Sequence, residues 1–167
     1  MAIELKNIDQ LKSMRKAGLV VADTLKLIKD SAQVGMTTVE LDEIAVANLK
    51  KHGATPSFLG YHGFPAVICA SVNEEVVHGI PNKRKLISGD VLSIDFGAII
   101  DGWHGDAAIS FGLGEIEAAD QKLMDVCQES MWRGIAAGRA GGKLTDISAA
   151  IEAVSYTHLR AHETDSY

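Results

Sequence analysis

The sequence predicts an α+β fold, because helix-like and strand-like hydrophobic periods occupy separate stretches of the chain. Apolar residues recur every three or four positions over residues 9–30 and again over 38–52. Short β-prone runs broken by glycine and proline follow over 55–111, and two more helical stretches cover about 117–137 and 145–154. The order of helix, glycine-containing loop and helix therefore occurs twice, which predicts a duplicated α+β unit whose second copy stops before its strands.

Both N-terminal helices carry start and stop signals. Asn7 or Asp9 can cap the first helix, whose apolar face consists of Leu11, Met14, Gly18, Val21, Leu25 and Ile28. Thr37 followed by Glu40 forms the capping-box pattern that opens the second helix, and Gly53 is a suitable residue to end it. For the last helix, Thr145 is the expected cap.

Residues 91–111 predict a β-hairpin, because two strand-like runs are joined by Asp101–Gly102, a dipeptide favoured in two-residue type I′ turns. With that turn, the numbers of paired residues add up to 203, so Gly97 faces Asp106 and Asp95 faces Ala108. One face of the hairpin is apolar throughout and is expected to pack on the helices. The opposite face is small or polar, and it holds Ser93, Asp95, Gly97, His104, Asp106 and Ser110.

Asp95 and Asp106 are the first candidates for chemistry. In the predicted register they are diagonal neighbours on one hairpin face, with backbones roughly 7–8 Å apart. Two crowded carboxylates repel each other, so either one is protonated or a cation neutralises them, and hard divalent ions prefer such oxygen ligands. The alternative, which the sequence leaves open, is that both are ordinary solvated strand residues.

His78 precedes a Gly-Ile-Pro turn, where its imidazole can donate a hydrogen bond to a developing oxyanion or bind a metal. A turn histidine without a role is the alternative. The segment 58–65 crowds aromatic residues and glycines, a composition suited equally to a small apolar pocket and to core packing.

Composition and charge narrow the class of protein. The 167 residues are 47% hydrophobic and 23% charged, which is typical of a globular chain. A net charge of −6 argues against DNA as a partner, and no stretch is apolar enough for a membrane span. Cys69 and Cys127 fit no zinc or redox spacing, and we expect both to be reduced in a cytoplasmic protein.

These residues together resemble the type I methionine aminopeptidases. The resemblance runs to about Val154, and five motifs occur in the order and spacing of that family: Tyr61–Pro65, Ser71–Glu74, Val77–Pro81, Gly89–Asp95 and Asp101–Asp106. It implies a pita-bread fold, in which two α+β halves enclose a pair of divalent ions, and an enzyme that removes the initiator methionine from nascent proteins.

The resemblance also assigns roles to residues. Asp95 would hold one ion with both oxygens and Asp106 would bridge the two, the metal being cobalt, manganese, iron or zinc. His78 matches the catalytic histidine that contacts the scissile peptide. The methionine pocket would be lined by Tyr61, Phe64 and Cys69, and the enzyme is expected to be a cytoplasmic monomer that acts near the ribosome. Phe58 departs from the family, in which a small residue often stands at the pocket wall.

A second departure concerns the C-terminal half, from which the family supplies three more metal ligands and a second catalytic histidine. The Gly-His-Gly-Ile-Gly segment that marks that half does not occur in this sequence. We therefore expect residues 1–154 to form the N-terminal part of the catalytic domain, without activity of their own. Residues 155–167 do not match the family and resemble translated adapter sequence. A non-catalytic pita-bread module that binds proteins is the alternative.

Overall fold

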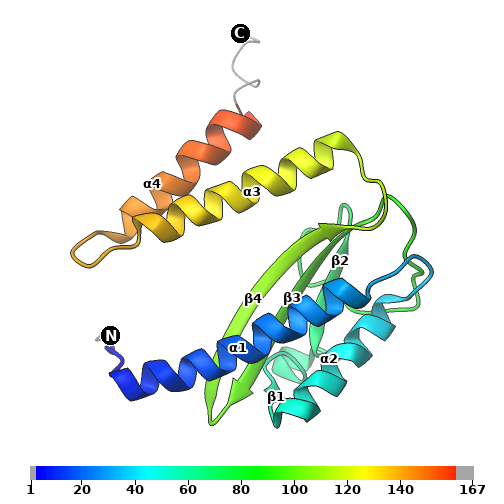
Figure 1. Ribbon diagram of the computed structural model, residues 1–167, viewed down its shortest axis with the longest axis horizontal. Coiled ribbons are helices and arrows are strands. Elements are labelled where there is room, and N and C mark those ends of the chain that lie inside the picture. The colour runs from blue at the N-terminus through cyan, green and yellow to red at the C-terminus, as the bar shows by residue number, and fades with distance from the viewer. Residues whose placement is uncertain (1–2, 161–167) are drawn as a thin grey trace. The chain divides into compact units, whose positions relative to one another are not determined.

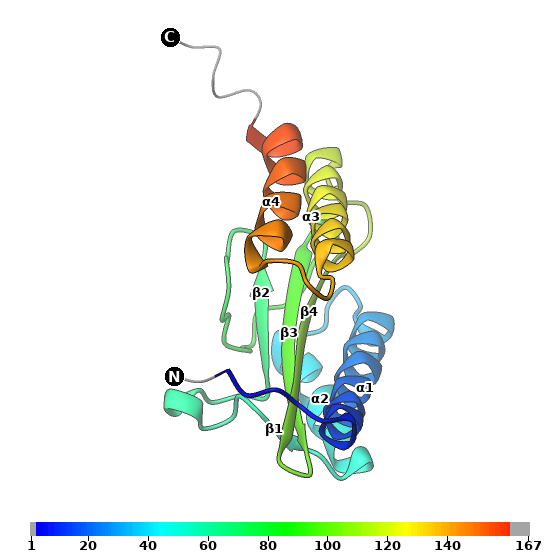
Figure 2. The ribbon, with the colours of Figure 1, turned by 90° about the vertical axis from the view of Figure 1, so that its left-hand side faces the viewer.

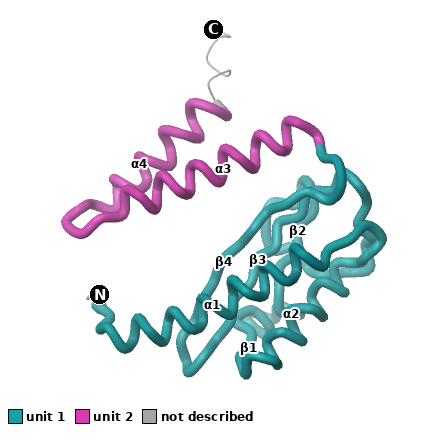
Figure 3. Tube along the Cα trace, viewed as in Figure 1, with its two compact units in different colours: residues 1–116 teal, residues 117–167 magenta. Residues whose placement is uncertain are grey.

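The computed structural model describes residues 3–160. The chain falls into two compact units that divide between Ile116 and Glu117, shown in different colours in Figure 3. All of the described strands belong to the first unit, and the second is helical. Within residues 3–160, no helix is long and apolar enough to cross a membrane.

Two helices open the first unit, as their capping signals predict. Helix α1 spans Ile8–Ser31 and begins with a capping box in which the side chain of Asn7 accepts hydrogen bonds from backbone N–H groups of the first turn. Helix α2 spans Thr38–His52 and begins with the predicted box of Thr37 and Glu40. It ends at Gly53, whose φ of 63° is the left-handed conformation that favours glycine.

The sheet of this unit is antiparallel and contains four strands: β1 (Thr55–Pro56), β2 (Ile68–Val72), β3 (Val91–Ile100) and β4 (Trp103–Gly112). Strand β3 is central and pairs with the other three (Figure 1). The hairpin register is the predicted one, with Gly97 opposite Asp106 and Asp95 opposite Ala108. The two faces of β3 and β4 are therefore those that the sequence predicts.

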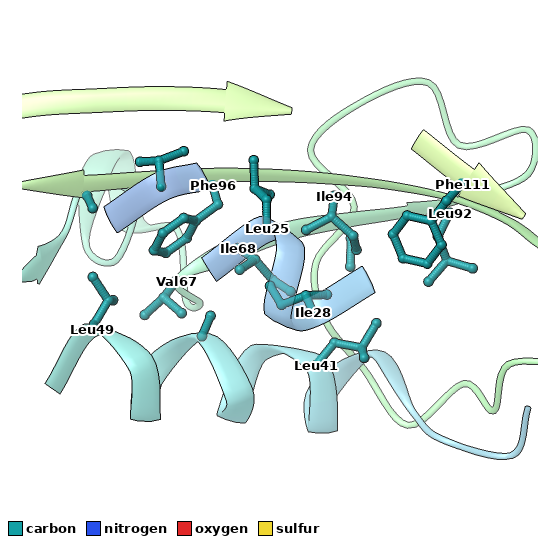
Figure 4. Close-up of a cluster of buried hydrophobic side chains, with 14 of the residues drawn as sticks. Leu25, Ile28, Leu41, Leu49, Val67, Ile68, Leu92, Ile94, Phe96 and Phe111 are labelled. Carbon is teal, nitrogen blue, oxygen red and sulfur yellow. The ribbon is translucent and has the colours of Figure 1, made fainter. Parts of the chain in front are cut away.

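The core lies between the helices and the apolar face of the sheet. Helices α1 and α2 cover one side of the strands, and the segment around residues 61–63 lies on the other (Figure 2). Both helices and three strands contribute to the core, whose side chains in Figure 4 include Leu25, Ile28, Leu41, Leu49, Ile68, Leu92, Ile94, Phe96 and Phe111. Burial of this apolar surface, worth roughly 25 cal/mol per Å², is the main term that stabilises the unit.

The predicted inner face of α1 is correct only in its second half. Val21, Leu25 and Ile28 are buried, whereas Leu11 and Met14 are 48% and 36% exposed. The buried surface turns instead toward Ala17, Val20 and Thr24. Residues before Ala17 share the helical period but lie beyond the part of the helix that faces the core.

Helix α1 crosses β4 at an unusually short distance. A Cβ atom added at Gly105 would lie 2.6 Å from the backbone nitrogen of Gly18 and 2.7 Å from the carbonyl carbon of Ala17. Only a residue without a side chain fits at that position of the strand. The helix backbone therefore rests directly on the strand.

The second unit is a helical hairpin of α3 (Ala118–Ala137) and α4 (Leu144–Ser155), followed by a π-helical turn over Tyr156–Arg160. The expected cap at Thr145 is wrong, because the N-cap of α4 is Lys143, two residues earlier, and the backbone N–H of Lys143 donates to Asp146 Oδ2 at 2.8 Å. Of the sequence interpreted as foreign, residues 161–167 lie outside the described part of the chain.

Candidate functional site

The two aspartates lie together on the face of the hairpin that points away from the helices. Asp95 is half-buried in the centre of β3, and Asp106 stands diagonally across from it on β4. Burial, the charge of Asp106 and a hydrogen bond between the two carboxyl groups raise the pKa of Asp95. Neither carboxyl group forms an ion pair with a lysine, arginine or histidine among the described residues.

This donor set fits a hard divalent cation. Carboxylate oxygens are the ligands that such ions prefer, and a cation between Asp95 and Asp106 would remove the repulsion that raises the pKa of Asp95. The set is small, however, since residues 3–160 contain no cluster of three or more acidic, histidine or cysteine side chains able to hold a metal. The site offers part of a coordination sphere.

His78 is placed beside this pair by a strained turn. Its backbone has a φ of 60°, which residues other than glycine rarely adopt. The following residue, Gly79, accepts a hydrogen bond from Ala70 N at 2.8 Å, and a Cβ there would lie 2.4 Å from Ala70 O. The turn therefore packs directly against β2. The charge of His78 favours the ionised form of Asp95 and so partly offsets the rise in the pKa of that carboxyl group.

One cavity of about 600 Å³ joins the candidate residues. Asp95 and Asp106 line it together with mainly aromatic and apolar residues, which include Phe58, Tyr61, Phe64, Pro65, Cys69, His78 and Ile80. All six residues that the sequence and the resemblance single out therefore face the same space. His62, which the sequence analysis did not select, lines it as well.

Cys69 sits opposite Asp95 in the pairing of β2 with β3 and is buried. Burial, together with the negative charges of Asp95 and Asp106, raises the pKa of its thiol to about 11. The thiol is therefore neutral near pH 7, and as a small apolar group it is better suited to the wall of a pocket than to a metal site.

The segment 58–64, which carries the aromatic residues of the cavity, is attached to the hairpin through the preceding residue, Ser57. Ser57 donates its backbone N–H to Gly97 O at 3.0 Å, and its hydroxyl lies 3.0 Å from His104 Nδ1. A Cβ at Gly97 would approach Ser57 Cβ to 2.7 Å, so the glycine lets the segment cross directly over β3. Beyond it, the rings of Phe58 and Phe64 meet edge to face at 6.5 Å.

Two buried or half-buried carboxylates support the site and were given no role by the sequence analysis. Asp90, only 2% exposed, accepts hydrogen bonds from Asn73 Nδ2 and Ile87 N, each at 2.9 Å. Asp42 on α2 accepts from Val67 N and Ile68 N, at 2.9 and 3.0 Å, at the start of β2. Asp90 lies within a motif that carries the resemblance, but nothing in the sequence signals that it will be buried.

Comparisons with known proteins find similar sequences and similar structures. The profile of "Metallopeptidase family M24" matches residues 12–164. Methionine aminopeptidase 1 of Mycobacterium tuberculosis is 51% identical over 148 residues, which is 88% of this chain and 56% of that protein. Methionine aminopeptidase of Clostridium acetobutylicum is 46% identical over 90% of this chain and 60% of that protein. The chain thus spans somewhat over half the length of these curated relatives.

Solved structures give the same result. The methionine aminopeptidase of Rickettsia prowazekii superposes with a TM-score of 0.91 and 36% identity, over 94% of this chain and 63% of that one. The enzyme of Thermotoga maritima gives a TM-score of 0.90 and 33% identity, over 93% and 63% of the two chains. Prolidase of Pyrococcus furiosus, at 15% identity and a TM-score of 0.83, shows the shared fold alone.

Proposed function

Because the chain belongs to metallopeptidase family M24 and has its pita-bread fold, we propose that it is the N-terminal part of an enzyme that removes methionine from the N-terminus of nascent proteins. The observation that carries the proposal is that Asp95 and Asp106 line the same cavity as Phe58, Tyr61 and Phe64. An aminopeptidase needs that juxtaposition, because the scissile bond directly follows the bound side chain.

Members of a metallopeptidase family use divalent ions, and Asp95 and Asp106 are the residues of this chain that would hold them. Cobalt, manganese, iron and zinc are the candidates. When bound, such a pair lowers the pKa of a shared water and polarises the peptide carbonyl. The half-buried position of Asp95 excludes part of the solvent, which strengthens the attraction of the carboxylates for any cation.

The other proposed roles follow from position. His78 borders the acidic pair, where its imidazole can donate a hydrogen bond to the oxygen on which negative charge develops. Tyr61, Phe64 and Cys69 would surround the methionine side chain, with the neutral thiol of Cys69 deep in the wall. The ring of Phe58, which lines the same cavity, would narrow the pocket.

We further propose that the 167-residue chain is itself inactive, since the resemblance implies five metal ligands and the chain supplies two. On this proposal, residues 1–154 are catalytic-domain sequence and residues 155–167 are foreign to it. The complete enzyme would be a cytoplasmic monomer that meets its substrate near the ribosome. A protein-binding module without catalysis is the second candidate, although a pure binder has no use for two repelling carboxylates.

The test measures activity and metal binding separately. The chain should release no methionine from a Met-Ala-Ser peptide with added Co²⁺ or Mn²⁺, whereas Mn²⁺ should raise its melting temperature, because an ion that binds only the folded state stabilises it. Asp106→Asn should abolish this rise, and Glu43→Gln, on α2 and away from the cavity, should retain it. Turnover like that of a complete enzyme would refute the inactivity. A Mn²⁺ response unchanged by Asp106→Asn would refute the site.

A further inference from the structure

The turn that carries His78 closes the outer edge of β2. Strand β2 pairs with β3 along one edge, and the backbone N–H groups of Ala70 and Val72 point to the other. There Ala70 N donates to Gly79 O at 2.8 Å, and Val72 N donates to Glu75 Oε2 at 2.9 Å. The beginning and the end of the turn are therefore both bonded to this edge of the strand.

A side chain of β2 makes a second bond to the end of the turn. Gly79 N donates to Ser71 Oγ at 3.1 Å, and Ser71 is only 3% exposed. Ser71 pairs with Ser93 of β3 and lies two residues along β2 from Cys69, so its side chain is on the face of the sheet that holds Asp95. Gly79 is thus held from two directions, by a backbone N–H at the strand edge and by a hydroxyl on the face of the sheet.

His78 directly precedes Gly79 in the chain and depends on these bonds for its conformation. Its φ of 60° lies in the left-handed region, which a residue with a Cβ keeps only where the surrounding structure holds it. The N–H group that donates to Ser71 belongs to the peptide group between His78 and Gly79. This hydrogen bond therefore sets the orientation of the peptide next to the His78 Cα, and with it the direction in which the imidazole leaves the backbone.

The imidazole that is placed in this way belongs to the candidate site. It lines the cavity with Asp95 and Asp106, and its charge acts on the carboxyl group of Asp95. Ser71 does not line that cavity, so any effect of its hydroxyl on the site has to act through the turn.

We propose that Ser71 is a positioning residue for His78: its hydroxyl holds the turn so that the imidazole remains in the cavity beside the two aspartates. Without the hydroxyl, the N–H group of Gly79 loses its acceptor and the left-handed turn relaxes, so the imidazole spends less time near Asp95. The inference rests on the proposed function for what the imidazole does there, which is to stabilise negative charge on the substrate oxygen. The placement itself is a property of the folded chain and is measured without substrate or metal.

Nuclear magnetic resonance of the 167-residue chain measures this placement. The chain has six histidines, and the ring signal that disappears in His78→Asn belongs to His78. Asp95→Asn should shift this signal, because it removes a charge that acts on the ring. In a Ser71→Ala background the shift should be at most about half as large, since the interaction weakens with distance. Ser71→Thr keeps a hydroxyl and should restore the full shift.

Ser93→Ala is the matched control, because it removes a hydroxyl from the residue opposite Ser71 on the same face of the sheet. The hydroxyl of Ser93 bonds to Ser110 Oγ at 2.8 Å and not to the turn. Its removal should leave the response of His78 to Asp95→Asn unchanged. A response that is as large in Ser71→Ala as in the unaltered chain, or that is lost equally in Ser93→Ala, would overturn the proposal.

Amide hydrogen exchange of Gly79 gives a test that begins with the unaltered chain. There the amide should be protected, and in Ser71→Ala it should exchange about 2–10-fold faster, which is the change in population that one hydrogen bond controls. A Gly79 amide that exchanges freely in the unaltered chain would also overturn the proposal. The metal site is judged separately, because Ser71→Ala should keep the rise in melting temperature with Mn²⁺. Absence of that rise in the unaltered chain would refute the metal site, whereas the ring signals decide the role of Ser71.

Discussion

Replacing Gly105 by alanine tests how closely helix α1 is held against strand β4. The added Cβ would lie 2.6 Å from Gly18 N, whereas ordinary contact begins at 3.4 Å, so the helix backbone has to retreat by about 0.8 Å. The atoms in the way belong to the backbone and cannot rotate aside. The retreat would loosen Val21 and Leu25, which pack into the core from the following turns of the helix.

The cost follows from the packing of the core. A gap of about 0.5–1 Å loses a quarter to a half of the attraction between the atoms that line it. Additional carbon atoms in a closely packed site destabilise a protein by about 1–3 kcal/mol. At about 4 °C per kcal/mol for a domain of this size, Gly105→Ala should lower the melting temperature by about 4–12 °C.

Gly18→Ala is the matched control, because Gly18 is the other glycine of the same contact. Its Cβ would meet nothing within 4 Å. Alanine in the interior of a helix is favoured over glycine by about 0.5–1 kcal/mol, so this variant should be slightly more stable. Melting followed by circular dichroism at a single protein concentration compares the two. Equal effects of the two substitutions, or a stable Gly105→Ala, would refute the close approach.

Three further predictions concern single side chains. Asp90→Ala should destabilise the protein by about 1–3 kcal/mol in urea titration, because it removes the buried carboxylate that accepts hydrogen bonds from Asn73 Nδ2 and Ile87 N; Asp90→Asn should cost less, and equal costs would argue against a role for the carboxylate. Hydrogen bonds from neighbouring side chains lower the pKa of Asp23 below its usual 3.8. The ionised Asp23 carboxylate therefore stabilises the folded state at pH values above its unfolded-state pKa, and this stabilisation is lost as the pH falls through its folded-state pKa. Since the side chain is 51% exposed, Asp23→Asn should cost at most about 1 kcal/mol at pH 7, and a difference in melting temperature that does not shrink as the pH falls below 3.8 would contradict this account. In alkylation at pH 8 followed by mass spectrometry, Cys127 should react well before Cys69, whose thiol pKa is raised to about 11; equal rates would show that Cys69 is not shielded.

Local signals were sufficient to predict the hairpin. The Asp101–Gly102 turn determines the register, and the register determines which side chains share a face. The proximity of Asp95 and Asp106 therefore follows from the amino-acid sequence alone. Helix ends were predictable where a side chain caps them, as at Thr37, but not at Lys143, where the acceptor is the carboxylate of Asp146 in the first turn.

Features that depend on distant residues could not be predicted. The periodicity of α1 predicts one apolar face along the whole helix. Leu11 is nevertheless exposed and Val21 is buried, because the sheet covers only part of that face. Likewise, Asp90 and Asp42 are acidic residues, a type that composition alone assigns to solvent. Both are shielded from solvent in the folded protein, where they accept hydrogen bonds from backbone N–H groups of loops and strands that come close only on folding.

The left-handed backbone of His78 determines which substitutions can be compared with one another. Residues with a Cβ typically lose about 1–2 kcal/mol in that conformation, and asparagine tolerates it better than most. His78→Ala would thus remove the imidazole and also change how easily the turn forms against β2. His78→Asn keeps the turn accessible and removes only the imidazole, so a loss of function in that variant can be attributed to the ring.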